Sequence, residues 1–440
     1  MDGPSKERQQ LSADNLYRLV RSEFQQVVDR RGGGVVIPLG DALMSGFGVF
    51  ALKAPSLLAF DKQRQSDAAN LKSLFGVNHV PSDTQMRTIL DEVESSQMRP
   101  AFTSVFRQLQ RGKALEPFVF FQGHYLMALD GTSYFSSEKI HCSGCLEKKS
   151  RNGKIAYSHQ MLGACLVHPE LREVIPLCPE AIVKQDGQTK NDCERNASRR
   201  FLEHFRREHP RLPVIVVEDA LSGNAPHLAD LTAHRMHFII GIKPGSQAFL
   251  FQQMQTAAEQ GQAQVLTLCD DQGTITHYRW LANASLNESH PNVRVSMLEF
   301  WEIKVNGSLR EFAWITDQPV NKDTVAILAS GGRARWHIEN ETFNTLKNQG
   351  YQYDHNFGHG DKNLSVIFAL LMMLAFLVDQ SMQLCDQLFQ AVWRKMGTKR
   401  ELWERVRCAF RQLLLTSMRQ LYQLLLINYK AIPAAATDTS

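Results

Sequence analysis

Three acidic residues stand where carboxylates could share a reaction: Asp130, Asp219 and Glu339. Carboxylates that are held close together repel one another. Hard divalent cations such as Mg²⁺ remove that cost, because they prefer oxygen ligands. Two such ions about 4 Å apart activate an attacking oxygen and stabilise a leaving oxygen at phosphorus. If these three acids meet in the fold, they predict metal-dependent phosphoryl transfer.

The elements around the acids must bring them together. An apolar run of strand length precedes Asp130, and Gly131 follows it, so we expect a buried strand that ends at Asp130. The alternative is that Asp130 only caps a turn, because Asp-Gly is a common turn pair. Asp219 follows a second apolar run in the same way. Sites on open sheets form where buried strands end, so we expect both acids at one sheet edge, joined by Glu339 from a later helix.

The residues around Glu339 resemble the signature helix of DDE transposases from bacterial insertion sequences. Arg335 precedes Glu339 by four residues, as it does in that family. Lys347 follows Glu339 by eight residues, where the best-known members have seven. The Tyr that usually opens the motif would fall at Gly332, so that element is absent.

Two further segments are similar to the same family. LDGT at 129–132 resembles the segment of the first catalytic Asp, and VEDA at 217–220 resembles that of the second. The separations of the three acids are 219 − 130 = 89 and 339 − 219 = 120 residues. The longer gap suits members with a β-strand insertion before the Glu. The resemblance covers roughly residues 80 to 380.

The resemblance implies a fold and a function. The fold would be α/β, with a ribonuclease H-like core, an inserted β-strand subdomain and flanking helical regions. Asp130, Asp219 and Glu339 would be catalytic and would bind Mg²⁺, for which Mn²⁺ can substitute. The enzyme would cleave the ends of an insertion sequence and join the 3′-hydroxyls to target DNA. Its partners would be the terminal inverted repeats, target DNA and a second copy of the chain. The alternatives are an inactive DNA-binding relic and a nuclease without strand transfer.

Basic residues near the acids are candidate DNA contacts. The resemblance implies that Arg335 and Lys347 contact phosphates. An ion pair from Arg335 to Glu339 or to another helix is the alternative. A basic loop between the first two predicted strands is usually a solvated face, but beside a DNA-cutting site it would contact phosphates. Its basic residues are Lys148, Lys149, Arg151 and Lys154.

Two acids compete with the chosen ones. Glu341 lies two residues from Glu339, so the two point to different sides of a helix, and the spacing from Arg335 favours Glu339. Glu218 precedes Asp219 and would point to the opposite sheet face. We favour Asp219, because the second acid of the resembled family is Asp.

A short metal-like cluster stands apart from the acids. His141, Cys142 and Cys145 form a CxxC motif preceded by His. A structural zinc needs further ligands at suitable spacing, and these could come from His159, Cys165 or His168. The alternative is a pair of free thiols near a turn.

Composition limits the class of protein. The net charge of the 440 residues is +4 and 43% of them are hydrophobic, so this is an ordinary globular chain, and any nucleic-acid surface must be local. The eight cysteines are scattered and the N-terminus is polar without a secretory signal, which indicates a reducing cytoplasm. The most apolar stretch, 364–378, is shorter than the roughly 20 residues of a membrane span. It therefore predicts a buried helix rather than a membrane segment.

Changes in pattern along the chain predict five regions. The core should contain strands 125–130, 157–168, 173–177, 213–217 and 236–242, with helices over 189–209 and 222–232. The insertion should contain strands 264–269, 274–280, 293–305 and 309–316. The regions are a helical 1–115 (a candidate for DNA binding), the first part of the core at 116–245, a β-rich insertion at 246–330, the second part of the core with the Glu helix at 331–380, and a helical 381–440.

Overall fold

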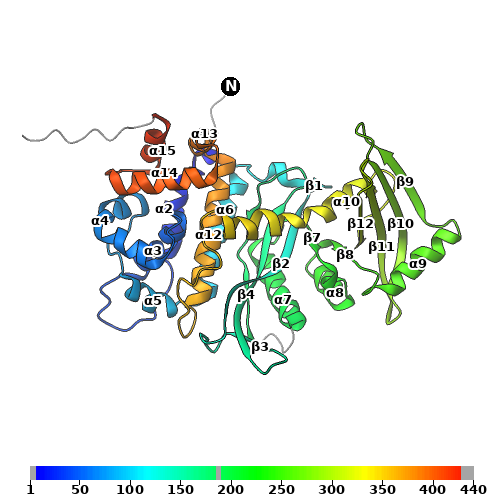
Figure 1. Cartoon of the computed structure of the whole chain (residues 1–440), viewed down its shortest axis with the longest axis horizontal. Coiled ribbons are helices and arrows are strands. Elements are labelled where there is room, and N and C mark those ends of the chain that lie inside the picture. The colour runs from blue at the N-terminus through cyan, green and yellow to red at the C-terminus, as the bar shows by residue number, and fades with distance from the viewer. Residues whose placement is uncertain (1–5, 185–189, 428–440) are drawn as a thin grey trace, which may run out of the picture. The chain divides into compact units, whose positions relative to one another are not determined.

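The chain folds into two compact units. The computed structural model describes residues 6–184 and 190–427 (Figure 1). Unit 1 combines Met1–Ala114 with Leu346–Ser440, and unit 2 spans Leu115–Thr345. The predicted helix start at Thr189 lies outside the described residues.

Unit 1 is helical. Its first part contains α1 (Lys6–Gln9), α2 (Ala13–Phe24), α3 (Leu39–Ala51), α4 (Leu57–Phe75), α5 (Asp83–Asp91), the 3-10 turn η1 (Ser95–Met98) and α6 (Arg99–Arg111). Its second part contains α12 (Leu364–Cys385), α13 (Gln387–Met396), α14 (Lys399–Gln412) and α15 (Met418–Ile427). Local signals set several of the helix ends. Ser82 caps α5 in a capping box with Gln85, and Gly76 ends α4 with a φ of 68°.

Helix α12 forms the centre of unit 1. It is long and apolar enough to cross a membrane, but 94% of its most apolar window is buried. The covering helices belong to the same unit and include α3, α5, α6 and α13. The buried helix predicted over 364–378 is therefore confirmed, and it extends to Cys385.

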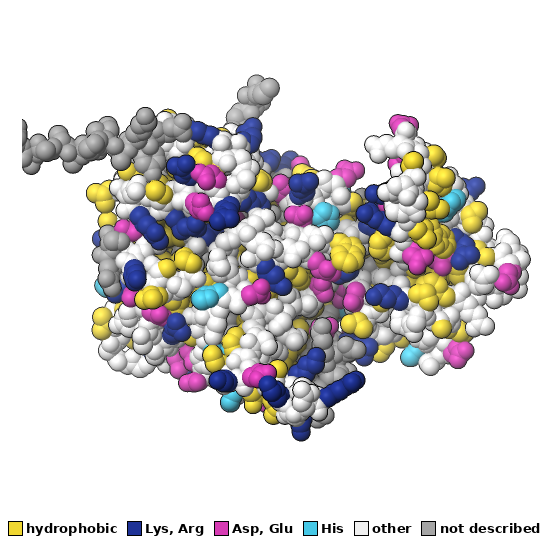
Figure 2. All heavy atoms as spheres, in the orientation of Figure 1, with side chains coloured by type: hydrophobic (Ala, Val, Ile, Leu, Met, Phe, Trp, Pro, Cys, Tyr) yellow, Lys and Arg dark blue, Asp and Glu magenta, His cyan; other side chains and the backbone are white. Residues whose placement is uncertain are grey.

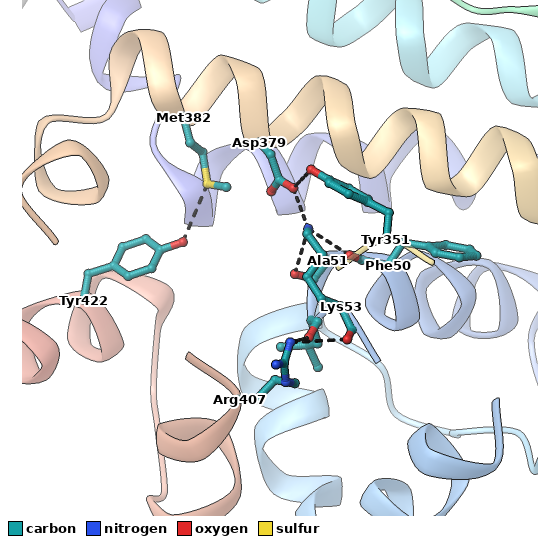
Figure 3. Close-up of polar contacts among 9 residues, drawn as sticks. Phe50, Ala51, Lys53, Tyr351, Asp379, Met382, Arg407 and Tyr422 are labelled. Carbon is teal, nitrogen blue, oxygen red and sulfur yellow. Dashed lines mark hydrogen bonds and ion pairs between the residues drawn. The ribbon is translucent and has the colours of Figure 1, made fainter. Parts of the chain in front are cut away.

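A charged group is buried where the two parts of unit 1 meet. The side chain of Lys53, which follows α3, has no exposed surface, and its Nζ lies 2.5 Å from Oδ2 of Asp379 on α12 (Figure 3). The hydroxyl of Tyr351 donates to the same carboxylate. The Lys53 ammonium also lies 4.0 Å from the ring centroids of Tyr351 and Trp403. Buried charges are rarely stable without such partners.

Unit 2 is built on one large mixed sheet. Its strands are β1 (Val119–Phe121), β2 (His124–Ser137), β3 (Leu146–Lys149), β4 (Ile155–Val167), β5 (Ile175–Pro176), β6 (Glu180–Ile182), β7 (Val214–Glu218), β8 (His237–Gly241), β9 (Gln264–Cys269), β10 (Ile275–Asn287), β11 (His290–Ile303) and β12 (Leu309–Thr316). The order along the sheet is β3-β4-β2-β7-β8-β12-β11-β10-β9. β2, β7 and β8 are parallel, whereas β4 and β12 pair antiparallel at either side of them.

The helices of unit 2 follow or interrupt these strands. They are η2 (Glu116–Phe118), α7 (Lys190–Glu208), η4 (Ala220–Ser222), α8 (Ala225–Ala233), α9 (Ala248–Glu259), α10 (Val325–Ala334) and the π-helical turn η5 (Ile338–Phe343), which runs into α11 (Asn344–Asn348). Glu218 of β7 contacts His227 of α8. A Cβ on Gly331 of α10 would lie 3.2 Å from Cδ1 of Ile239, which pairs with Val217. Since Val217 and Glu218 point to opposite faces, α8 and α10 cover opposite faces of the sheet.

Several predicted elements differ from the structure. The strand expected to end at Asp130 runs on to Ser137, because Asp130 and Gly131 pair with β4 instead of forming a turn. Helix α8 begins later than predicted and is capped by Asn224 rather than Ser222. Gly331 and Gly332 do not precede the late helix but lie inside α10. A Cβ on either glycine would collide with an aromatic ring, of Phe120 or Trp314 respectively.

The inserted segment, predicted at 246–330, has longer strands than predicted and one additional helix. β9 and β12 have the predicted bounds, but β10 and β11 form one long hairpin with residues 281–287 and 290–292 added. A register shift between Leu281 and Ala284, with Asn283 at a φ of 58°, interrupts the alternation there. Helix α9 was not predicted, although its buried residues Leu250, Met254 and Ala257 have helical spacing.

Candidate active site

Asp130 lies at the point where β2 loses its parallel neighbour. The pairing of β2 with β7 ends at Ala128 opposite Val217, while the pairing with β4 continues through Asp130 opposite Gly163. Asp130 and Ala128 point to the same face because they are two residues apart. Asp130 therefore lies just past the end of the parallel pairing of β2 with β7, where sites on open sheets commonly form.

The late helix meets Asp130 on that face. Arg335 follows α10, and its Nη1 lies 3.5 Å from Oδ2 of Asp130. Its Nη2 lies 2.9 Å from Oε1 of Glu339 on η5. Only 13% of the Arg335 side chain is exposed. One guanidinium therefore joins two acids that are far apart in the sequence, and the ion pair that stood as the alternative role of Arg335 is present.

The π-helical turn positions Glu339. π-helical turns are rare and often occur at functional sites. The turn packs on β2 and β4, and the Phe343 ring fills the space beside Gly163, where a Cβ would lie 2.8 Å from that ring. Gly163 is the pairing partner of Asp130. The contact of Phe343 with Gly163 therefore places the π-helical turn, and Glu339 with it, next to Asp130.

Asp219 approaches the same carboxylate from β7. It lies just past the end of that strand, is exposed, and accepts a hydrogen bond from the Leu221 N–H at 3.0 Å. Asp130 and Asp219 line one small cavity of about 40 Å³. Among the described residues, the carboxylate oxygens of these three acids do not all lie within 4.8 Å of one another, the separation that would let them share a metal ion. Their side chains would have to move closer together to bind one.

The electrostatics of the cluster centre on Asp130. Burial raises the pKa of its carboxyl to about 7, and the nearby charges of Glu339 and Asp219 add to the rise. The Arg335 guanidinium opposes them. Three carboxylates with one buried cation leave a net negative charge on hard oxygen donors, which is the chemistry that a divalent cation such as Mg²⁺ matches.

The two competing acids have other partners. Glu218 is buried, and its Oε2 lies 2.5 Å from Nε2 of His227. Burial lowers the pKa of His227, but the Glu218 carboxylate outweighs burial and leaves that pKa above its usual value. Glu341 acts on His337, whose pKa burial lowers and the Glu341 charge raises in part. Glu218 thus lies on the face covered by α8.

The other predicted DNA contacts are exposed, whereas Arg335 is mostly buried. Lys148 and Lys149 lie on β3, and Arg151 and Lys154 lie in the turn that joins β3 to β4. Lys154 lies 3.5 Å from Glu138. Figure 2 shows Lys and Arg side chains gathered at the lower edge of the view, in the region of this hairpin. Lys347 on α11 is also exposed, and it belongs to unit 1.

Sequence reasoning missed two residues at this site. Glu194 of α7 lies against Gly131, where a Cβ would be 2.7 Å from its Oε1, and it lines the same cavity as Asp130. Its distance in sequence from the three acids gave no signal, because α7 lies on the sheet face opposite to the one that Asp130 faces. Trp336 is 46% exposed beside Arg335, with the guanidinium 5.0 Å from its ring. Its place next to Arg335 in the motif was the available signal.

Ionisation of Asp130 should oppose folding of the metal-free protein. A group whose folded pKa is raised contributes stability below its unfolded pKa of 3.8, and that stability is lost as the pH rises through about 7. We expect Asp130→Asn to match the native chain at pH 4 and to raise the free energy of unfolding by about 2 kcal/mol at pH 8. Urea unfolding in EDTA at pH 4 and pH 8 measures the free energy of unfolding of both chains. An equal difference between the two chains at both pH values would contradict the raised pKa of Asp130.

No protein-family model matches the chain, and no curated protein is similar to it. Among solved structures, the chain is similar to the cryo-EM structure of a piggyBac transposase synaptic complex with hairpin DNA. That similarity covers 100% of this chain and 90% of that one, with 9% sequence identity and a TM-score of 0.44.

Proposed function

We propose that the chain is a DDE transposase that cleaves the ends of an insertion sequence and joins the freed 3′-hydroxyls to target DNA. The observation that carries this proposal is the bridge from Arg335 to both Asp130 and Glu339. Asp219 acts on the same carboxylate. Acids from three distant segments thus form one cluster, with an Arg at the spacing that the motif requires.

The sheet order supports a ribonuclease H-like core. β4, β2, β7 and β8 are neighbours in that order, with β4 antiparallel and the other three parallel. The helix α7 connects the antiparallel part to β7, and α8 connects β7 to β8. β9 to β12 extend this sheet before the Glu339 turn, as an insertion before the third acid would.

Asp130, Asp219 and Glu339 would hold Mg²⁺. When bound, Mg²⁺ lowers the pKa of an attacking water or hydroxyl and stabilises charge at phosphorus. The three carboxylates would hold the Mg²⁺ charge at one position beside the phosphate. Burial of Asp130 would limit the access of other water molecules to its carboxylate. Arg335, which pairs with two of them, would exchange part of that pairing for a DNA phosphate.

DNA would be held mainly by exposed basic residues. Lys148, Lys149, Arg151 and Lys154 on the β3–β4 hairpin and Lys347 on α11 would contact phosphates without reading bases. The joining of two ends calls for two active sites, so we propose a homodimer acting on inverted repeats in the cytoplasm.

The decisive experiment uses purified full chain and DNA that carries the ends of its own element. We expect nicking that requires Mg²⁺ or Mn²⁺ and leaves 3′-hydroxyls, followed by joining of pre-cut ends to a plasmid. Cleavage without joining would favour a nuclease. Binding without metal-dependent cleavage would favour an inactive relic.

A further inference from the structure

A second cluster of ligand-type side chains lies at the base of the β3–β4 hairpin. Cys142 and Cys145 come from the turn before β3, and His159 comes from β4, next to the residue that pairs with Leu146. We propose that Cys142, Cys145 and His159 bind a structural zinc ion that fixes this hairpin to the sheet.

The distances between the ligand atoms match tetrahedral zinc. The two Sγ atoms are 3.9 Å apart, and Nε2 of His159 lies 3.4 Å from Sγ of Cys142 and 3.5 Å from Sγ of Cys145. With Zn–S bonds of about 2.3 Å and Zn–N bonds of about 2.0 Å, tetrahedral angles place two sulfurs about 3.8 Å apart and a sulfur and a nitrogen about 3.5 Å apart. A disulfide would need about 2.05 Å between the sulfurs.

The local backbone holds the two cysteines in one turn. The N–H of Cys142 donates to Sγ of Cys145 at 3.4 Å, and the N–H of Cys145 donates to the Cys142 carbonyl at 3.2 Å. The second of these bonds closes the turn between the two residues. Gly144 lies between the cysteines in the same turn, and a Cβ at this position would lie 3.8 Å from both Cys142 Sγ and the His159 ring.

Burial indicates a structural rather than a catalytic ion. Cys145 and His159 are almost completely buried, with Cys145 1% and His159 4% exposed. The Tyr134 and Phe135 rings of β2 lie beside the His159 ring. Such a site excludes substrate and holds its ligands in place. A structural zinc has four ligands, so one further ligand completes the set.

The other residues of the sequence motif lie elsewhere. His141 is exposed and stacks on Tyr157, with ring centroids 4.4 Å apart. Cys165 lies in the buried part of β4 and accepts a hydrogen bond from Thr342. His168 packs near Phe120. Of the three candidates for further ligands (His159, Cys165 and His168), only His159 lies within contact distance of the two cysteines.

The site has a consequence for DNA binding, and this part rests on the proposed function. β3 begins directly after Cys145, and Lys148 and Lys149 follow within four residues. β3 contributes only Leu146–Lys149 to the sheet, and it is an edge strand with one neighbour. Zinc would tie the turn before β3 to β4 and so hold these basic side chains in one arrangement.

The test measures metal in the full chain, expressed with zinc and purified under reducing conditions. We expect about one zinc per chain by mass spectrometry, and an X-ray absorption spectrum with two sulfur ligands and at least one nitrogen. Cys142→Ser should lose most of the zinc. Cys269→Ser, an exposed thiol of the same unit, and His141→Ala should keep it. Alanine scanning of the remaining histidines then identifies the fourth ligand.

Two further measurements keep the result clear if a variant fails to fold. Native chain loaded with Co²⁺ should show the visible bands of tetrahedral thiolate coordination. Reconstituted native chain that holds less than about a tenth of a zinc per chain would overturn the proposal. Zinc content does not depend on cleavage, so a chain that holds zinc but cuts no DNA would contradict the proposed function alone.

Discussion

Asp130→Asn, Asp219→Asn and Glu339→Gln will each leave DNA bound but uncut. Each variant removes one carboxylate from the proposed metal site while keeping the side-chain size. Charge stabilisation by a bound metal contributes several kcal/mol to the transition state, so we expect cleavage to fall at least about a thousandfold. A gel assay of nicking in Mg²⁺, with DNA binding measured in parallel, checks this.

Glu341→Gln is the matched control. It lies on the same π-helical turn as Glu339, but its charge acts on His337, so we expect near-native cleavage. If Glu341→Gln is inactive and Glu339→Gln is not, the roles of the two acids are exchanged. The Asp130 variant adds a second safeguard, because it is expected to be more stable than the native chain at pH 8. Its inactivity could not then be ascribed to unfolding.

Lys53→Met will destabilise unit 1 strongly. The change keeps an unbranched side chain, one atom shorter than that of lysine, but leaves the Asp379 carboxylate buried without its cation (Figure 3). Burial raises the pKa of Asp379, and Lys53 opposes that rise. Breaking a buried pair in this way typically costs about 3–5 kcal/mol. Urea unfolding followed by circular dichroism measures the loss.

A surface pair of the same unit provides the comparison. Arg400 and Glu404 on α14 form an ion pair at 3.2 Å, with the Arg400 side chain 88% exposed. Arg400→Met should change stability by less than about 0.5 kcal/mol. The double variant Lys53→Met/Asp379→Asn should recover part of the loss, because it removes the orphaned charge and keeps a partner for Tyr351. Equal costs for Lys53→Met and Arg400→Met would show that the buried pair contributes little.

The sequence predicted the elements of unit 2 where one pattern ran without interruption. β9 and β12 have the predicted bounds because each alternates or is apolar over its whole length. The bulge near Asn283 broke the alternation of β10, so its second half was missed. Gly331 and Gly332 looked like a helix break, although they allow two aromatic rings to pack against α10. Only the fold shows which role a glycine has.

The candidate site shows the same limit. Motif spacing gave the pairing of Arg335 with Glu339 as one alternative, and alternation along β7 gave the face of Glu218. The position of Asp130 inside a strand was not predictable from Asp-Gly, because pairing with β4 decides it. Glu194 reaches the cavity from a separate helix, and no local pattern reports a contact of that kind.

The division of unit 1 into two stretches of chain affects the order in which the protein can fold during synthesis. Unit 2 is contiguous, so its 345 − 115 + 1 = 231 residues can complete their contacts as they leave the ribosome. Helices α2, α3, α5 and α6 must wait for α12, because it packs against each of them. At about 5–20 residues per second, that wait lasts tens of seconds. Chaperone demand should therefore fall on the N-terminal helices, and a chain that stops after Thr345 would leave them exposed permanently.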